Sequence, residues 1–438
     1  MKKVNINFLQ RRINLSNLVE QDSLIILSSS NLKTRNSDAH YPFRQNSNFY
    51  YLTGFDEPES LMLLKPNKDG GEFTLFCRDR DPLREQWDGF RAGQEGAVKD
   101  YGADTAYSIT RLDELMPKLI EGVKNIYFIM ADSDGLHLSI NKWLDSVRLN
   151  TRNGSEVPHN FIALESILNE MRLIKSPEEL EIMKIAGLIT GEAHCNAMKT
   201  ISPGMTEYQL EAEYLNVFMK NGARFPAYTS IVGGGNNACI LHYNENRDEL
   251  RDGDLVLVDA GCEYQNYASD VTRTFPVGGK FSKEQKAIYE VVLEAHRKAL
   301  QQIKPGNSWI LAQEASVKAI TQGLIDLKIL EGELEELIAN EEYTKFYMHR
   351  IGHWLGMDVH DVGDYKVDGK WRTLKEGMVL TIEPGIYILN SLQNVDSKWL
   401  GIGIRIEDDV LVTENGFEIL TSEIPRDIQD IELLMQGN

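Results

Sequence analysis

Four carboxylates and one imidazole in the C-terminal half of the chain could together bind metal ions. They are Asp259, Asp270, His353, Glu383 and Glu407. Each lies in a short segment with the composition of a strand or a strand end, so the five side chains could meet on one face of a sheet. Oxygen-rich ligation with one imidazole suits Mn²⁺, Co²⁺ or Fe²⁺ better than a structural zinc site or a Ca²⁺ site. The residue types therefore predict two divalent cations and metal-assisted hydrolysis.

The first two carboxylates lie in DLVLVDAGCEYQNYASDVTRTF, where two β-like runs flank a turn that contains Gly261. We expect Asp259 and Asp270 to face each other across a hairpin. Cross-strand partners lie about 5 Å apart at Cβ, so two carboxylates there would raise each other's pKa unless a cation lies between them. Either aspartate alone could be a turn residue or a helix cap, and the spacing of the pair favours the metal site.

The two glutamates follow apolar runs. In VLTIEPGIYI, Glu383 precedes Pro384, where a strand ladder must end. The segment GIGIRIEDDVLV predicts one strand with Arg405 and Glu407 on the same face. An isolated Arg–Glu pair of this spacing is more often a surface ion pair. The pair therefore supports a metal site only because the other candidate ligands occur in the same domain.

Four of the nine histidines fall in two short segments: His242 in ILHYNEN, and His349, His353 and His360 in HRIGHWLGMDVHDVG. His349 and His353 lack the intervening Glu of H-E-x-x-H, and Gly352 weakens a helix there, which excludes the zincin motif. The chain also lacks a G-x-S-x-G motif and a phosphate-binding loop. His353 remains a metal-ligand candidate, with three further imidazoles beside it.

Two domains must position these side chains, because 438 residues exceed one ordinary core. Residues 1–173 alternate β-rich runs with helical patterns and predict an α/β domain. In SPEELEIMKIAG, Ser176 can cap a helix whose first residue is Pro177. The second domain, residues 174–438, alternates helices with long strands and predicts an α+β class.

Composition narrows the functional classes. A formal charge of −20 argues against nucleic-acid and anionic-membrane partners, which require clustered Lys and Arg. The sequence has no apolar run of signal-peptide length or membrane-spanning length, so we expect a cytoplasmic protein. The four cysteines have neither metal-type nor redox spacing, which predicts reduced thiols.

The order Asp, Asp, His, Glu, Glu with the words VDAG, YASDVTRTFPV, GHWLGMDVHD, TIEPGIYI and GIRIEDDVLV resembles the pita-bread metallopeptidases. The N-terminal words RNSDAHYPFRQNSNFYYLTGF extend the resemblance over essentially the whole chain, to the proline-specific aminopeptidase branch of that family. The resemblance implies an α+β pita-bread catalytic domain preceded by a smaller α/β domain of the creatinase and prolidase type. It also implies a dinuclear Mn²⁺ site.

The resemblance further assigns roles to residues of this chain. Asp270 and Glu407 match the bridging carboxylates, Asp259 matches a ligand of one ion, and His353 and Glu383 match ligands of the other. The implied catalytic residues are Glu383, His242, His360 and Arg405. The implied substrate-binding residues are Asp38, Arg152, His349 and Tyr387.

The implied activity is removal of the N-terminal residue from peptides with proline at the second position, by a hydroxide that bridges two cations. We expect tripeptides and longer substrates to be preferred, and a homo-oligomer. Prolidase, which is restricted to dipeptides, is the nearest alternative. A non-enzymatic binding protein or a metal-free creatine amidinohydrolase of the same fold would show a broken ligand set, and a methionine aminopeptidase would not need the first domain.

Overall fold

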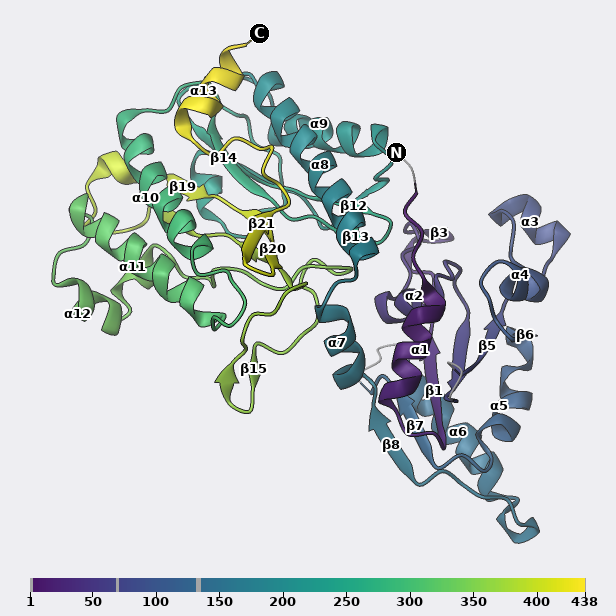
Figure 1. Ribbon diagram of the computed structural model, residues 1–438. Helices are drawn as coiled ribbons and strands as arrows, with labels where there is room; N and C mark the ends of the chain where they lie inside the picture. The colour runs from purple at the N-terminus through teal and green to yellow at the C-terminus, as the bar shows by residue number, and fades with distance from the viewer. Residues whose placement is uncertain (1–2, 68–70, 131–134, 438) are drawn as a thin grey trace. The chain divides into compact units, whose positions relative to one another are not determined.

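The computed structural model describes residues 3–67, 71–130 and 135–437, and the chain divides into two compact units (Figure 1). The N-terminal unit is Ile6–Glu170, and the C-terminal unit is Met171–Asn438 together with the residues up to Asn5. The division falls within helix α7 (Glu165–Leu173). The last residue of this helix, Leu173, is also the last residue of the first domain predicted from the sequence.

The N-terminal unit is built on a mixed six-stranded sheet with the order β6-β5-β4-β1-β7-β8. Its central strand β1 runs antiparallel to β4 and parallel to β7. The sheet strands are β1 (Ser23–Ser28), β4 (Leu61–Lys65), β5 (Glu72–Cys77), β6 (Thr105–Ser108), β7 (Asn125–Phe128) and β8 (Asn160–Ala163). The remaining elements are α1 (Phe8–Leu18), α2 (Ser47–Thr53), α3 (Pro82–Asp88), α4 (Gly93–Lys99), α5 (Leu112–Ile120), α6 (Leu136–Arg148), the hairpin β2 (Thr34–Asn36) and β3 (Ala39–His40), and the short 3₁₀ turns η1 (Ile109–Arg111) and η2 (Thr151–Asn153).

The helices of the C-terminal unit begin where the sequence provides caps. At the start of α8, the Ser176 hydroxyl accepts a hydrogen bond from the Glu179 N–H, and the Glu179 carboxylate accepts one from the Ser176 N–H, as the capping box requires. Ser282 and Gln285 repeat this arrangement at α10. The helices are α8 (Pro177–Thr200), α9 (Glu207–Lys220), α10 (Lys283–Leu300), α11 (Ile310–Asp326), α12 (Leu334–Ala339) and α13 (Ile428–Gln436).

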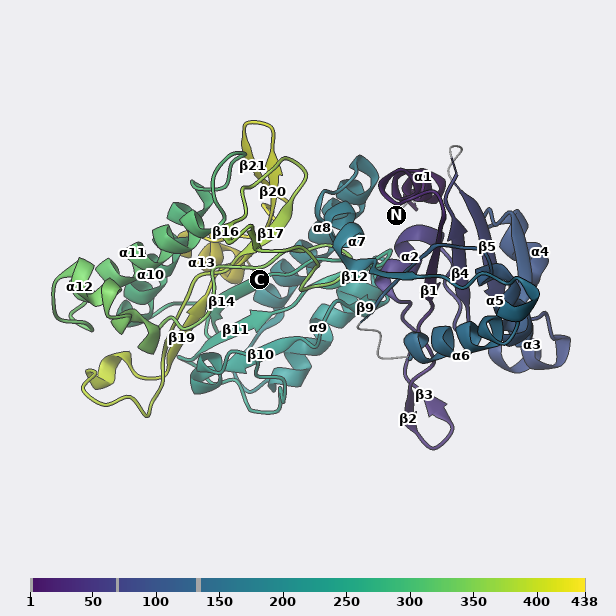
Figure 2. The same cartoon turned by 90° about the horizontal axis from the view of Figure 1, so that it is seen from below.

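The strands of the C-terminal unit form several small sheets. In Figures 1 and 2, β14 and β19 lie between the helix pair α8 and α9 and the helix pair α10 and α11. An apolar cluster that includes Ile303, Trp309, Ile382 and Val410 connects the second helix pair to the strands. The strands are β9 (Phe225–Pro226), β10 (Ile231–Gly234), β11 (Leu255–Asp259), β12 (Cys262–Tyr264), β13 (Tyr267–Ala268), β14 (Thr272–Pro276), β15 (Lys366–Val367), β16 (Lys370–Trp371), β17 (Val379–Ile382), β18 (Gly385–Ile388), β19 (Ile402–Arg405), β20 (Asp408–Thr413) and β21 (Gly416–Ile419). Three further 3₁₀ turns are η3 (Gly235–Cys239), η4 (Glu342–Lys345) and η5 (Ser397–Trp399).

One long hairpin is interrupted at the same level on both arms. Strand β17 pairs with β20, and β18 pairs with β19, but the two pairs belong to different sheets. The single strand predicted over GIGIRIEDDVLV is therefore wrong in this detail, whereas the predicted end of the ladder at Pro384 is confirmed. Pro384 has no N–H to continue the ladder on the first arm. The breaks leave Glu383 and Glu407 outside any strand and at matching positions.

The connection between the two aspartates also differs from the prediction. Strand β11 pairs with β14, but Asp259 lies opposite Thr272 and not opposite Asp270 as predicted, and the turn is not at Gly261. The chain makes a second hairpin, β12 and β13, which turns at Gln265 and Asn266 with φ of 47° and 65°. A Cβ at Gly261 would lie 1.7 Å from the Ser269 carbonyl oxygen, so the chain passes too close there for a side chain.

Candidate active site

A cavity of about 600 Å³ in the C-terminal unit collects most of the predicted site residues. All five predicted metal ligands line it: Asp259, Asp270, His353, Glu383 and Glu407. Four of the other predicted residues line it too: His242, His349, His360 and Arg405. The structure therefore brings together segments that lie more than a hundred residues apart in the sequence, as the strand pattern had indicated.

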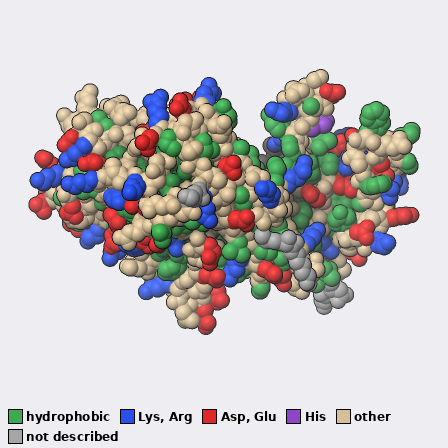
Figure 3. All heavy atoms as spheres, turned by 90° about the horizontal axis from the view of Figure 1, so that it is seen from above, with side chains coloured by type: hydrophobic (Ala, Val, Ile, Leu, Met, Phe, Trp, Pro, Cys, Tyr) green, Lys and Arg blue, Asp and Glu red, His purple; other side chains and the backbone are tan. Residues whose placement is uncertain are grey.

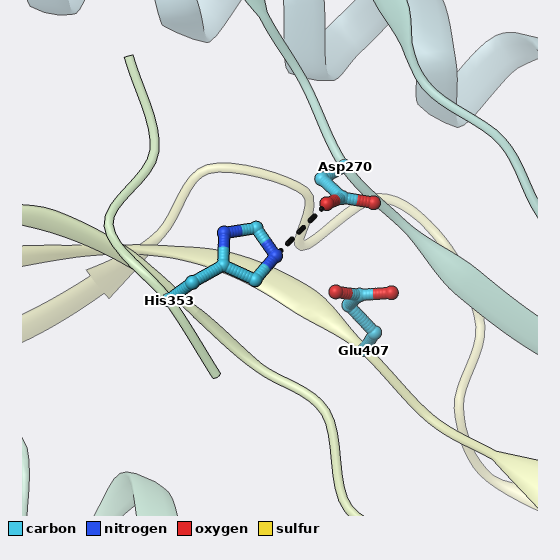
Figure 4. Close-up of side chains that lie close together, drawn as sticks. All are labelled: Asp270, His353 and Glu407. Atoms are coloured by element: carbon cyan, nitrogen blue, oxygen red, sulfur yellow. Dashed lines mark ion pairs between the residues drawn. The ribbon is translucent and has the colours of Figure 1, made fainter. Parts of the chain in front are cut away.

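Asp270, His353 and Glu407 form the tightest group, with one ligand atom of each lying within 4.8 Å of the others (Figure 4). The Nε2 atom of His353 lies 3.3 Å from Oδ2 of Asp270 and 3.6 Å from Oε1 of Glu383. The Nδ1 atom of the same ring lies 3.1 Å from the Trp354 carbonyl oxygen. That hydrogen bond fixes the ring and leaves Nε2 for a cation, a common arrangement around metal-binding histidines.

The Asp259 and Asp270 carboxylates are joined by a residue that the sequence analysis did not identify. The Tyr228 hydroxyl lies 2.5 Å from Oδ1 of Asp259 and 2.6 Å from Oδ1 of Asp270. One hydroxyl has one proton, so it can donate to only one of the two acceptors at a time. The site between these oxygens still suits a positive charge. Tyr228 belongs to no recognisable motif, and only the three-dimensional contact reveals it.

Arg405 connects the carboxylates to the other side of the cavity. Its Nη1 donates to the Tyr387 hydroxyl at 2.9 Å, and that hydroxyl lies 2.8 Å from Nε2 of His349. Its Nε donates at 2.9 Å to the Thr272 hydroxyl, which donates at 2.6 Å to Glu407. Tyr387 is fully buried and contacts the site through these hydrogen bonds, and Thr272 is a second residue that the sequence analysis missed.

Arg405 also reaches the first aspartate. Its Nη2 lies 2.6 Å from Oδ2 of Asp259, and its side chain is only 4% exposed. Arg405 and Glu407 therefore belong to a buried hydrogen-bond network and do not form a surface ion pair.

The two exposed histidines border the cavity. The His360 ring packs edge-on against His353, with 4.4 Å between ring centroids and 76° between ring planes. Burial, and then the charge of His353, lower the pKa of His360. His242 lies on the cavity wall beside Leu241. Both imidazoles can therefore reach a bound ligand without displacing the carboxylates.

Asp38 and Arg152 belong to the N-terminal unit. Asp38 lies in the exposed turn between β2 and β3, and Arg152 lies in the exposed 3₁₀ turn η2. Their contribution to substrate binding remains a prediction.

The electrostatics of the cavity support a metal centre. Burial raises the pKa of Asp259 to about 6 and that of Glu383 to about 7. Burial also raises the pKa of Glu407 well above its usual range, and the neighbouring carboxylates raise it further. For His353, burial lowers the pKa, but its hydrogen bond to Asp270 and the negative charges of Asp270 and Glu383 together raise it to about 9. Buried carboxylates in this number need more positive charge than Arg405 and one imidazole supply, and the oxygen-rich donor set fits hard divalent cations.

Comparison with known proteins agrees with this geometry. The chain matches the description "Metallopeptidase family M24" over residues 181–414 and "Aminopeptidase P, N-terminal domain" over residues 8–127. It is 46% identical to the Xaa-Pro aminopeptidase of Haemophilus influenzae, over 98% of this chain and 96% of that protein. It is 43% identical to the Xaa-Pro aminopeptidase of Escherichia coli, over 98% and 97%. The solved structure of Pseudomonas aeruginosa aminopeptidase PepP superposes with a TM-score of 0.98 at 50% identity, covering 99% of both chains.

Proposed function

The chain belongs to metallopeptidase family M24, and from this premise we propose that it is a Xaa-Pro aminopeptidase, which releases the N-terminal residue from peptides with proline at the second position. The predicted fold class, a pita-bread α+β domain after a smaller α/β domain, is confirmed. The observation that carries the function is the complete ligand set in one cavity of a chain from this family. A binding protein of the same fold would not need to retain it.

We propose that Asp259, Asp270, His353, Glu383 and Glu407 hold two divalent cations, and that Mn²⁺ is the metal. The single imidazole among four carboxylates supports a hard cation over a structural zinc. When bound, the cations would supply Lewis acidity, which lowers the pKa of a water molecule and polarises the scissile carbonyl.

The residues around the ligands would handle protons and charge. Glu383 lies 3.6 Å from His353 and 3.7 Å from His349, and we propose that it carries a proton to the leaving nitrogen, a role typically worth about 10²–10⁴-fold. His242 and His360 would donate hydrogen bonds to the oxygen on which negative charge develops. Arg405 would hold Asp259 and Tyr387 in place, because it hydrogen-bonds to both.

Selectivity would come from the walls around this chemistry. A second-position proline has no amide proton and a fixed φ, so a pocket shaped for its ring can reject other residues. We propose that His349 and Tyr387 help to bind the substrate in the cavity, and that Asp38 and Arg152 of the N-terminal unit contact it as well. These four assignments follow from the family resemblance.

The test compares kcat/KM for Xaa-Pro, Xaa-Pro-Yaa and Xaa-Ala-Yaa peptides that share a first residue. We expect Xaa-Pro-Yaa to be cleaved fastest. A dipeptide advantage of about tenfold or more, roughly 1.4 kcal/mol of transition-state stabilisation, would make the protein a prolidase. Equal cleavage of Xaa-Ala-Yaa would exclude a proline pocket.

We also propose that the protein is a homo-oligomer. The N-terminal unit has large apolar side chains at its surface (Figure 3), and Leu83, Trp87 and Phe90, on α3 and just after it, are 75%, 87% and 91% exposed. Clustered exposed aromatic residues are typical of protein–protein interfaces. A second copy of the chain is the proposed partner, and light scattering of the protein and of Trp87→Ser would test it.

A cytoplasmic location remains part of the proposal. Cys77, Cys239 and Cys262 are free and buried, which suits a reducing compartment. Within the described residues, no helix is both long enough and apolar enough to cross a membrane.

A further inference from the structure

Four charged side chains, three of them buried, pair with one another at the loop that carries His353 and His360. We call this group the linker clamp, and its members are Arg172, Lys175, Asp358 and Asp361. Nη2 of Arg172 lies 2.6 Å from Oδ1 of Asp361 and 2.6 Å from Oδ2 of Asp358. Nζ of Lys175 lies 2.9 Å from Oδ2 of Asp361. Both oxygens of the Asp361 carboxylate are therefore held by cations, and three of the four side chains are 2% exposed or less.

The clamp joins two segments that lie far apart in the sequence. Arg172 lies in the last turn of α7, and Lys175 lies between α7 and α8, so both follow shortly after the N-terminal unit ends at Glu170. Asp361 is the residue after His360. A carboxylate that two cations fix inside the protein has few alternative positions, because any movement would leave buried charges unpaired.

The loop itself is closed around this carboxylate. The Asp361 N–H donates to the Trp354 carbonyl oxygen at 2.9 Å, which brings the chain after His360 back to the residue after His353. A Cβ at Gly356 would lie 2.1 Å from Oδ2 of Asp361 and 3.0 Å from Cε of Lys175. The backbone at Gly356 is therefore in close contact with the side chains of the linker clamp.

We propose that Arg172 and Lys175 are positioning residues, which act through Asp361 to hold His360 against His353 at the cavity wall. His360 is exposed, so its ring takes its position largely from the backbone, and Asp361 is the adjacent anchor. This proposal depends on the proposed function in one respect, which is that His360 contacts the substrate. A purely stabilising ion cluster is the alternative, and the experiment is chosen to separate the two.

The first variant is Lys175→Met, which removes one of the two cations and keeps the apolar stem. We expect kcat on a Xaa-Pro-Yaa peptide to fall about tenfold, as misplacing one hydrogen-bonding group does, with metal content and KM nearly unchanged. Lys175→Arg should restore activity to within about threefold, because the charge returns. If Lys175→Met does not fold, Asp361→Asn should be tested in its place, because it removes the carboxylate charge and keeps the side-chain shape.

The matched control is Lys184→Met on α8, the helix that begins two residues after Lys175. Lys184 pairs with Glu418 at 2.8 Å, and both side chains are about half exposed. Loss of this surface pair should leave kcat unchanged. If Lys175→Met lowers the melting temperature but retains full kcat below it, the cluster is only structural and the proposal is wrong.

A double-mutant cycle decides whether the clamp acts through His360. If it does, Lys175→Met combined with His360→Ala should be no slower than His360→Ala alone. Losses that multiply would overturn the proposal.

A crystal structure of Lys175→Met tests the clamp without any activity. The His360 ring should lie farther from the His353 ring than the 4.4 Å described above. An unchanged ring position overturns the proposal even if the enzyme is slower. If the wild-type protein cleaves no Xaa-Pro peptide, the proposed function fails, and this structural comparison still decides the role of the clamp.

Discussion

Glu407 and Asp408 are adjacent in the sequence and equally buried, yet their surroundings are opposite. The Asp408 carboxylate contacts Arg273 at 2.7 Å, Arg426 at 2.8 Å and His296 at 3.2 Å. Burial would raise its pKa, but the Arg273 charge and the other partners lower it well below the usual range. The Glu407 carboxylate faces other carboxylates, and burial with their charges raises its pKa. Consecutive side chains of an extended segment point to opposite sides, so one residue of sequence separates the two environments.

The difference distinguishes a structural charge cluster from a functional one. Around Asp408, each charge has its partner before any ligand arrives, which is typical of an ion network that holds strands together. Around Glu407, the protein leaves negative charge uncompensated, a local conflict that is expected at functional sites and that a cation can resolve. Four measurements would sharpen or break this comparison.

Metal removal should have the largest effect. Chelation should abolish peptidase activity and lower the melting temperature, because the carboxylates around Glu407 lose the cations that compensate them. Addition of Mn²⁺ should restore both, and elemental analysis should find about two ions per chain. Full activity in protein shown to be metal-free would contradict the proposed chemistry.

Glu383→Gln should have the next largest effect, a loss of about 10²–10⁴-fold in kcat with a smaller change in KM, because it removes a ligand charge and the proposed proton carrier. The control is Glu414→Gln, an exposed residue of the same unit. A kcat within about threefold of wild type would exclude a proton-transfer role for Glu383.

Asp408→Asn should act on stability. It leaves Arg273 and Arg426 buried or half-buried without a counter-charge, and the expected loss is about 3–5 kcal/mol in the free energy of unfolding. Urea unfolding of the metal-loaded protein measures it. The number of bound ions should not change. A loss of metal with unchanged stability would reverse the roles assigned to the two neighbours.

The pH dependence of stability should have opposite signs in the two regions. Burial raises the pKa of Glu383 from 4.5 to about 7, so the metal-free folded protein keeps a proton that the unfolded chain has released. Stability of the metal-free protein should therefore fall by about 1–3 kcal/mol as the pH rises from about 5 to 7. The lowered pKa of Asp408 stabilises the fold at neutral pH, and that contribution is lost only in acid.

Urea unfolding at several pH values, with and without Mn²⁺, would measure this dependence. The metal-loaded protein is the control and should not lose stability over the same range, because bound cations favour the ionised carboxylates. A metal-free protein that gains stability with rising pH would contradict the description of the cavity.

The sequence predicts the ligands better than the backbone that holds them. The types and spacing of Asp259, Asp270 and His353 are visible in the chain, as is the capping box at Ser176. Pro384 indicated the break beside Glu383, but the break at Glu407 was missed because apolar residues continue on both sides of it, and a periodic pattern does not show a switch between sheets.

Residues identified by contact alone were also missed. Tyr228 and Thr272 lie in ordinary strand-forming segments, and their roles arise from partners elsewhere in the fold. The pairing of Arg172 with Asp361 spans 189 residues. No local signal in one sequence specifies a contact at that distance.

The matched breaks of the β17–β18 and β19–β20 hairpin have a consequence for how the protein can change over evolution. Because Glu383 and Glu407 lie at the same level of one hairpin, a one-residue insertion or deletion within either arm would shift one glutamate relative to the other and turn alternate side chains away. The 389–401 connection lies beyond the breaks, and its length can vary without altering that register. Homologous chains should therefore vary in the length of this connection. The number of residues between the connection and each glutamate should hardly vary.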